Sequence, residues 1–270
     1  MRTQSFVREG AVATAVDTWF KLTGDVLGTA QDINVPSWAQ SVKVVKAGVG
    51  VDGATASGNI LVSLRGACKY GDQILAMGGY TNIGTTVAIA QGGMKRDVDI
   101  PIVPGKSLEL WACVAGGDTG TPEVQVQVTL SDAPANHAYI TRQRALATVN
   151  TWETCNTEDG TTAVNDPSVQ GRMIDQVWAV VGLSPTTQEP HQVMYRLMGV
   201  SGSIEGNEHV FTSSSNLVSD GTLADATLDS GMVDDVAIGV TSGTLRIQGI
   251  DSSASSTADP ELAVTVCFQM

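Results

Sequence analysis

The chain has 270 residues, of which 42% are apolar and 16% are charged, and its formal net charge at pH 7 is −13. The apolar fraction excludes an intrinsically disordered chain, and the acidic excess disfavours nucleic acid as a partner because phosphate groups would be repelled. The charged fraction lies below the roughly 25% that is typical of soluble domains. We interpret this shortage as a sign that neighbouring subunits cover part of the surface.

Residues 1–16 are polar at first and then small, without a strong period, and are interpreted as an N-terminal arm. Their apolar part, residues 11–16, is too short for the core of a signal peptide. No run in the chain approaches the 18 apolar residues of a membrane-spanning helix. We therefore expect the protein to be made in a cytoplasm and not to be exported by the usual secretory route.

Residues 17–132 form the first predicted unit. Its apolar residues recur with a period of two in short segments separated by Gly-rich turns, which is the pattern of half-buried strands. The clearest case is residues 124–130, where valine and leucine alternate with glutamine and threonine. Strands are predicted over residues 19–22, 42–51, 59–69, 85–90, 97–103, 108–114 and 124–130, and residues 74–77 fit either a strand or a turn.

Residues 133–149 are interpreted as a connector, in which residues 139–147 have some helical propensity. The second unit follows over residues 150–270 and repeats the plan of the first. Its predicted strands are residues 152–155, 175–183, 193–200, 208–213, 236–240, 245–250 and 262–268. Residues 217–228 leave two alternatives open, a short helix or a short strand within a long loop.

Similarity within the chain indicates that one unit has been duplicated in tandem. Asp17-Thr18-Trp19 recurs as Asn150-Thr151-Trp152, 133 residues later, and residues 122–128 (PEVQVQV) recur as residues 260–266 (PELAVTV), 138 residues later. The same two offsets relate Ile60, Val62, Leu64 and Gly66 to Val193, Tyr195, Leu197 and Gly199, and Ile100, Ile102 and Gly105 to Ile238, Val240 and Gly243. The length of the chain agrees with two domains.

Seven or eight short strands in each unit of about 120 residues are typical of a β-sandwich. Immunoglobulin-like and jelly-roll sandwiches both fit, and eight strands with loops of varied length favour the jelly roll. The predicted fold class is all-β, with two tandem eight-stranded jelly-roll-like β-sandwiches.

The sequence assigns no catalytic, cofactor-binding or metal-ligating residue. The three histidines, at 137, 191 and 209, are not spaced as metal ligands, and only His191 and His209 with Glu208 nearby form a conceivable set. No GxSxG motif is present, and we predict that the protein is not an enzyme. Four cysteines without metal-binding spacing are expected to be reduced and mostly buried: Cys68, Cys113, Cys155 and Cys267.

Acidic residues leave two further alternatives open. A pair of carboxylates would serve glycoside hydrolysis, but nothing in the pattern distinguishes two of the candidates. These candidates are Glu153, Glu158, Asp159, Asp234, Asp235 and Glu261. Oxygen ligands in loops suit calcium, so structural calcium is the one cofactor that remains open. Its candidate ligands are Asp118, Asp225, Asp229, Asp234 and Asp235.

Tryptophan and arginine are further candidates for binding residues. Trp19 and Trp152 occupy equivalent positions in the two units, which favours core packing over two sugar-binding sites. Trp111 and Trp178 fall in predicted strands, so we expect them in a core or an interface. The arginines that are close together, and that would contact phosphate or form ordinary surface pairs, are Arg2, Arg8, Arg142 and Arg144.

Two jelly-roll-like units in tandem, a short N-terminal arm and no export signal resemble the double jelly-roll major capsid proteins of tailless icosahedral double-stranded DNA viruses. The resemblance covers roughly residues 17–270. It implies a structural virion protein whose homotrimers present six jelly rolls as a pseudo-hexameric tile of an icosahedral shell. The implied partners are neighbouring trimers, other capsid proteins and, through an arm carrying Arg2 and Arg8, an internal membrane, with no sequence-specific nucleic acid. The implied location is the virion, after synthesis in the host cytoplasm.

Two other classes of function stay open at this point. A non-viral protein would use two β-sandwich modules to bind carbohydrate or to build a surface layer. A two-domain β enzyme of the bicupin kind is disfavoured, because such sites take two or three histidines from one barrel.

Overall fold

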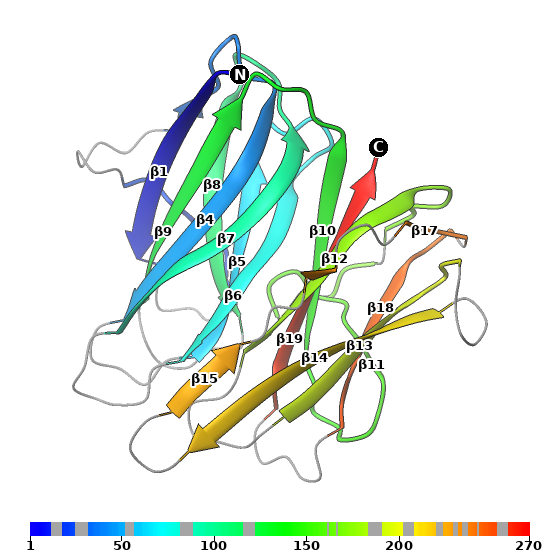
Figure 1. Ribbon diagram of the computed structural model, residues 1–270. Coiled ribbons are helices and arrows are strands. Elements are labelled where there is room, and N and C mark those ends of the chain that lie inside the picture. Colours follow the sequence, from blue (N-terminus) through cyan, green and yellow to red (C-terminus); the bar gives the residue numbers. More distant parts are fainter. Residues whose placement is uncertain are drawn as a thin grey trace.

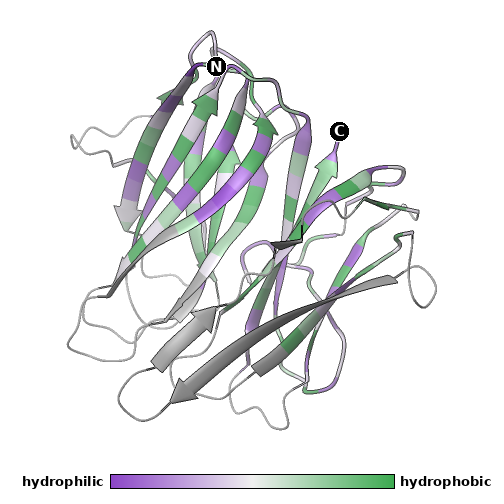
Figure 2. Ribbon diagram, in the orientation of Figure 1, coloured by the Kyte–Doolittle hydropathy of each residue, from purple (hydrophilic) through white to green (hydrophobic). Residues whose placement is uncertain are grey.

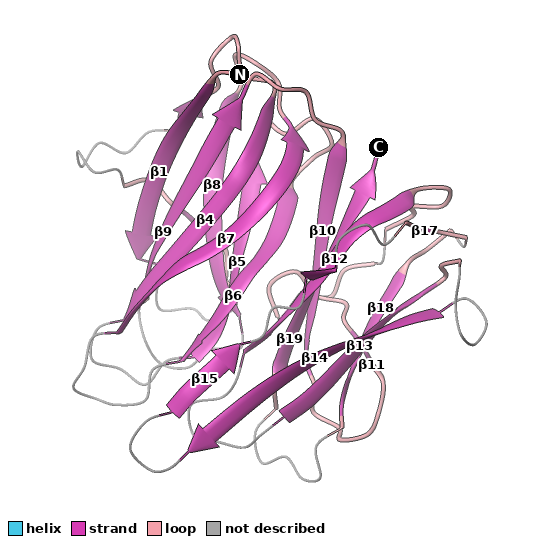
Figure 3. Cartoon of the chain, in the orientation of Figure 1, coloured by secondary structure: helices cyan, strands magenta, loops and turns pink. Residues whose placement is uncertain are grey.

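The computed structural model describes residues 1–11, 18–24, 32–51, 57–81, 89–115, 122–160, 162–165, 167–182, 191–201, 208–219, 224–228, 232–233, 237–241, 243–252 and 259–270. Every helix or strand assigned within these ranges is a β-strand (Figure 3). No helix with the length and apolar character needed to cross a membrane occurs in them. The all-β prediction is confirmed.

The first sandwich consists of two antiparallel sheets. One contains, in spatial order, β1 (Thr3–Ala11), β9 (Glu123–Ser131), β4 (Ser41–Val51) and β7 (Ile89–Pro101). The other contains β2 (Phe20–Lys21), β8 (Ser107–Ala115), β5 (Ser57–Arg65) and β6 (Gln73–Thr81), with β3 (Ile33–Asn34) also paired to β8. Each sheet contains strands from both halves of the unit, which is the strand order of a jelly roll.

The second sandwich repeats this order. Its first sheet contains β10 (His137–Ala145), β19 (Glu261–Gln269), β12 (Met173–Gly182) and β16 (Met232–Val233), with β17 (Ile238–Gly239) also paired to β12. Its second sheet contains β11 (Glu153–Thr154), β18 (Arg246–Asp251), β13 (His191–Met198), β14 (Glu208–Ser219) and β15 (Ala224–Leu228). The two sandwiches stand side by side (Figure 1). Two jelly-roll-like sandwiches in tandem are therefore confirmed.

Equivalent backbone hydrogen bonds support the duplication. Written with the donor first, the matching pairs are Leu22–Leu110 and Cys155–Ile247, Lys69–Pro101 and Ser201–Gly239, and Val103–Ala67 and Thr241–Gly199. Strands β5 and β13 are followed by glycines with nearly the same backbone angle, φ = 81° at Gly66 and 82° at Gly199. This left-handed conformation suits glycine, and a Cβ on Gly66 would lie 2.6 Å from the carbonyl oxygen of Ser107.

Two of the segments predicted from the sequence, the N-terminal arm and the connector, were wrong. Residues 3–11, predicted as an arm, form β1, which pairs with β9 along its whole length. Residues 137–145, predicted as part of a connector with helical propensity, form β10, which pairs with β19. Each strand is the first of its sandwich, and neither has a regular apolar period. Strand β1 is exposed or half-buried throughout, and β10 buries the polar residues Thr141, Arg142 and Gln143. Long-range pairing overrides local propensity in both cases.

The outer faces of the two equivalent sheets differ. Strand β9 alternates between buried valine and more exposed glutamine, and Figure 2 shows the stripes of purple and green across this sheet. Strand β19 is buried from Leu262 to Phe268, because its outward positions hold Ala263, Thr265 and Cys267 in place of polar residues. A sheet that is apolar on both faces is covered on both faces. The cover on the outer face is the first sandwich.

The first sandwich contacts this face mainly through β6, the edge strand of its sheet. Five residues of the second sandwich join the hydrophobic core of the first: Tyr139, Trp178, Val180, Ala263 and Cys267. Trp178 is fully buried, as predicted for a core or an interface, and its ring lies 5.9 Å from that of Tyr139. The core of the first sandwich therefore continues onto the outer face of the second, whose interior is a separate cluster.

Side chains of the second sandwich also satisfy the free backbone groups of β6. The amide of Ala76 donates to Thr265 Oγ1 (3.0 Å), and Thr141 Oγ1 donates to the carbonyl of Ile74 (2.6 Å). The two threonine hydroxyls lie 2.8 Å apart. Because Thr141 already donates its hydroxyl proton to Ile74, Thr265 is the donor in this pair. We call this chain of hydrogen bonds, from the amide of Ala76 through both hydroxyls to the carbonyl of Ile74, the threonine relay. Trp178 Nε1 donates to the carbonyl of Ala76 (2.8 Å). An edge that would otherwise invite another strand is thereby closed.

Arg96 of β7 adds a buried charge to this contact. Its Nε donates to the carbonyl of Ala76 (3.2 Å), and its guanidinium lies 5.5 Å from the centre of the Trp178 ring. Burial lowers the pKa of Arg96 to about 10, which still leaves the side chain charged at neutral pH. The hydrogen bond and the ring stabilise this cation, although its Nη2 is buried without a hydrogen-bond partner.

Replacing Thr265 with valine tests the relay. Thr265→Val keeps the shape of the side chain but leaves the buried amide of Ala76 without an acceptor, so we expect a loss of about 1–3 kcal/mol in unfolding free energy, measured by urea denaturation. Thr129→Val is the matched control, because Thr129 makes an exposed hydroxyl pair with Ser5 across β9 and β1. The control should cost less than about 0.5 kcal/mol, and equal losses in the two variants would contradict the relay.

Candidate functional site

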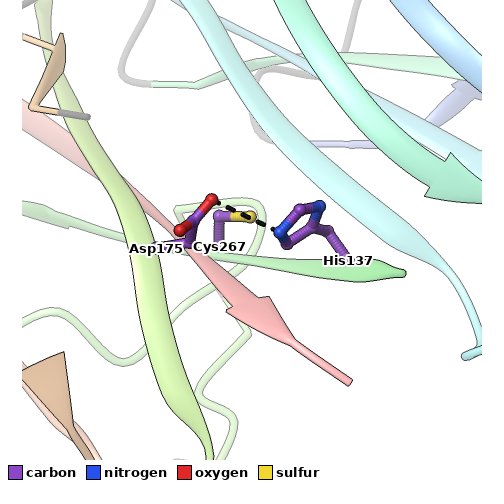
Figure 4. Close-up of side chains that lie close together, drawn as sticks. All are labelled: His137, Asp175 and Cys267. Atoms are coloured by element: carbon purple, nitrogen blue, oxygen red, sulfur yellow. Dashed lines mark ion pairs between the residues drawn. The ribbon is translucent and has the colours of Figure 1, made fainter. Parts of the chain in front are cut away.

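Five ionisable side chains meet where the two sandwiches join: Lys43, Asp99, His137, Asp175 and Cys267. We call them the junction cluster. Strands β4 and β7 of the first sandwich supply the lysine and Asp99, and strands β10, β12 and β19 of the second supply the other three. Figure 4 shows the imidazole of His137, the carboxylate of Asp175 and the thiol of Cys267 pointing toward one another.

His137 lies between two carboxylates. Its Nδ1 is 3.1 Å from Asp99 Oδ2, and its Nε2 is 3.3 Å from Asp175 Oδ2. A neutral imidazole has one N–H, so it donates to only one of these oxygens, whereas an imidazolium donates to both. A proton or another cation at Nε2 therefore decides how the second carboxylate is satisfied.

Asp99 connects the cluster to the first sandwich. Its carboxylate forms an ion pair with Lys43 and accepts a hydrogen bond from the amide of Asn136 (3.2 Å), while its own amide donates to the hydroxyl of Tyr139 (2.9 Å). Burial acts to raise the pKa of Asp99, but the hydrogen bonds from Lys43, Asn136 and His137 outweigh it and leave the pKa below its usual value. This carboxylate is therefore ionised at neutral pH.

Lys43 and Asp175 occupy equivalent places in the duplicated fold. The pairing of β4 with β9 shifts between Val42 and Val44, and the pairing of β12 with β19 shifts between Ile174 and Gln176. In each case the residue inside the bulge is the extra one, Lys43 or Asp175. A bulge changes the direction of a side chain, and here both copies direct a charged side chain into the same cluster.

The thiol of Cys267 is fully buried. Burial is the main cause that raises its pKa to about 12, against a smaller opposing effect of the hydrogen bond with Tyr139. Cys267, His137 and Asp99 are the residue types of a thiol nucleophile, its base and the base's orienting carboxylate. A catalytic cysteine needs a lowered pKa and access to substrate, and Cys267 has neither.

The histidines proposed from the sequence are not brought together. His191 pairs with Ser215 at one end of the β13–β14 ladder, and His209 pairs with Leu197 near the other end. Their side chains and that of Glu208 lie outside the described residues, as does the side chain of Asp225. Asp118, Asp229, Asp234 and Asp235 lie outside the described ranges altogether, so the structure does not test the calcium alternative.

Three of the six carboxylates that the sequence offers for hydrolysis have structural partners. Glu153 pairs with Arg144 (3.0 Å), and Glu158 pairs with Arg142 (3.0 Å), whose side chain is buried. Asp159 accepts a hydrogen bond from the amide of Thr162 (2.7 Å). These contacts hold the start of the second sandwich together.

Arg2 and Arg8 also contact the protein itself. Arg2 lies over the ring of Trp38 (4.4 Å), and Arg8 donates to the carbonyl of Val7 (2.7 Å). Arg8 lies in β1, which is a strand of the first sandwich. Residues 3–11 therefore do not form the arm that was predicted to present Arg2 and Arg8 to a membrane.

The equivalent tryptophans were expected in the cores but are only half-buried. Arg65 lies over Trp19 (5.2 Å) and Arg196 over Trp152 (4.2 Å), so each copy of the fold pairs this ring with a cation. One face of each ring is occupied, which reduces its use for stacking on a sugar.

The sequence does not predict the junction cluster, because its members are spread from residue 43 to residue 267. Two signals were present. The outward positions of β19 are apolar where those of β9 are polar, which indicates a covered surface. Asp175 follows Lys43 by 132 residues, close to the offset of the duplication, so the two are equivalent residues with opposite charge.

Comparisons with known proteins give a fold likeness only. No family model and no curated protein matches the chain. Among solved structures, it is similar to PNGase F, a glycosylasparaginase from Flavobacterium meningosepticum (TM-score 0.46, 9% identity, covering 100% of this chain and 96% of that chain). It is also similar to the major capsid protein P2 from bacteriophage PM2 (TM-score 0.36, 9% identity, covering 98% and 97%).

A third similar structure is PNGF-II (TM-score 0.45, 9% identity, covering 89% of this chain), of whose length this chain spans 59%. These likenesses include an amidase and a capsid protein at about the same low identity. They therefore transfer neither activity to this chain, and the function has to be argued from its own residues.

Asp99→Asn tests whether the junction cluster joins the sandwiches. The amide loses the ion pair with Lys43 and one acceptor for His137, so we expect unfolding free energy to fall by about 1–3 kcal/mol, measured by chemical denaturation. Asp97→Asn is the control on the same strand, because Asp97 pairs with Lys95 on the exposed surface and should cost less than about 0.5 kcal/mol. If Asp97→Asn lowered the unfolding free energy as much as Asp99→Asn, this would contradict the role of the junction cluster in joining the sandwiches.

Proposed function

We propose that the protein is a structural virion protein, the major capsid protein of an icosahedral virus, and that it assembles as pseudo-hexameric homotrimers. The observation that carries this proposal is the pair of jelly rolls with the same strand order in one chain, fused by the closed edge of β6. Three copies of such a chain present six similar jelly rolls around one axis, which fits a tile in a sixfold environment.

The junction suits a building block because it holds the two sandwiches as one body. The buried ring of Trp178, the threonine relay and the junction cluster all lie between the two sandwiches. One sandwich can rotate against the other only after these contacts are broken. Relative domain motion is the ordinary expectation for two domains joined by a small polar contact. The buried apolar contact between the sandwiches opposes that motion, and a shell needs tiles of constant shape.

The chemistry of the described residues supports a role without catalysis. The one arrangement with catalytic residue types, around His137, has a nucleophile that is buried and held protonated. Two of the six carboxylates that the sequence offers for hydrolysis, Glu153 and Glu158, form ion pairs with arginines. We therefore propose that the protein is not an enzyme.

The proposed partners are further copies of the chain, first within the trimer and then between trimers, together with other capsid proteins. The proposed location is the virion, after synthesis in the host cytoplasm. Contact with an internal membrane through an N-terminal arm is no longer part of the proposal, since β1 takes up those residues. No sequence-specific contact with nucleic acid is proposed for a chain with a net charge of −13.

Solution mass tests the proposal. Sedimentation velocity over a range of protein concentrations should show a species with three times the mass of the chain, and electron microscopy of concentrated samples should show hexagonally packed tiles or closed shells. A chain that stays monomeric throughout and binds glycans on an array would contradict the capsid proposal and favour the carbohydrate-binding alternative. Flat arrays without trimers would favour a surface layer.

A further inference from the structure

We propose that His137, Asp175 and Cys267 form a binding site for one zinc ion. One potential ligand atom from each residue lies within 4.8 Å of those of the other two. The three residues come from β10, β12 and β19, which are neighbours in one sheet, and Figure 4 shows the groups converging. The inference concerns a site that the proposed capsid function does not use, and it stands or falls independently of that function.

The separation of the nitrogen and oxygen atoms already fits a metal. His137 Nε2 and Asp175 Oδ2 are 3.3 Å apart. Two ligands at about 2.0–2.1 Å from a tetrahedral zinc ion are separated by about 3.4 Å. These two groups therefore need little movement to share an ion, and the thiol needs a shift of roughly an ångström to complete three protein ligands.

Groups around the site hold its ligands in the orientation that a metal requires. His137 Nδ1 faces Asp99 Oδ2 at 3.1 Å, so a proton on Nδ1 leaves the Nε2 lone pair directed at the site. Asp175 Oδ1 accepts a hydrogen bond from Gln269 Nε2 (3.2 Å). A carboxylate behind the histidine and a donor behind the liganding carboxylate are the usual outer partners of zinc ligands. These contacts are a second observation, independent of the cluster itself.

The donor set selects the metal. One imidazole nitrogen, one thiolate sulfur and one carboxylate oxygen suit zinc, whereas calcium and magnesium take oxygen ligands. On binding, the Cys267 S–H bond breaks, a sulfur–zinc bond forms and the proton leaves to solvent, with no change of oxidation state. The ion replaces any proton on His137 Nε2. It also balances the negative charge of Asp175, because Lys43 forms its ion pair with Asp99.

The site is partly open to solvent. The side chains of His137 and Asp175 are 19% and 22% exposed, whereas Cys267 is fully buried. An ion thus enters past the histidine and the carboxylate and meets the thiol last. Once bound, it ties β10, β19 and the bulge of β12 together, and Asp99 extends that link to the first sandwich.

The experiment uses the full chain, treated with a chelator and then titrated with zinc chloride by calorimetry, and with cobalt chloride to detect a thiolate-to-cobalt absorption band. We expect one ion per chain, the cobalt band, and a higher Tm with zinc than without. Asp175→Asn and Cys267→Ser should each weaken zinc binding by at least about tenfold, and Asp99→Asn by about 10–100-fold.

Cys68→Ala is the matched control, because the Cys68 thiol also has a pKa raised by burial to about 12 but does not belong to the cluster of His137, Asp175 and Cys267. It should bind zinc like the parent chain. Circular dichroism checks that each variant is folded, and Asp175→Asn, on the partly exposed bulge, provides the test if Cys267→Ser does not fold. Absence of zinc binding by the parent chain, or equal affinity in the parent and Asp175→Asn chains, would overturn the proposal.

Discussion

The closed edge of β6 is the constraint on which the rest of the structure depends. A strand at the edge of a sheet leaves backbone donors and acceptors that water or another strand must satisfy. Here the outer face of the second sandwich satisfies them through Thr141, Thr265 and Trp178. That face must then be apolar between its hydrogen-bonding groups, which explains why β19 carries alanine, threonine and cysteine where β9 carries glutamine and threonine.

Duplication supplied both partners of this contact, and divergence made them complementary. The two copies keep the same strand order, equivalent backbone hydrogen bonds and a bulge at the same point of β4 and β12. Their outward residues have changed, so that one copy offers an edge and the other a face. The equivalent bulge residues now have opposite charge, Lys43 and Asp175, and both serve the cluster between the sandwiches.

The same junction connects the proposed structural role with the proposed zinc site. A rigid pair of jelly rolls suits a shell, and a metal at the edge of the contact between the sandwiches would add stability without adding catalysis. The thiol chemistry is consistent with this division, because burial keeps Cys267 from acting as a nucleophile yet a metal displaces its proton. The site would therefore act on folding and rigidity, and the assembly surfaces would lie elsewhere on the molecule.

By itself, the sequence determined the all-β class, the duplication and most central strands, because alternating valine, isoleucine and leucine report which residues face a core within one sheet. It misjudged residues 3–11 and 137–145, where polar residues, some of them buried in β10, interrupt that period. Only the tertiary structure decided which edge meets which face and which charged residues meet. Those contacts join residues as far apart as Ala76 and Thr265, and local periodicity carries no information about partners at such separations.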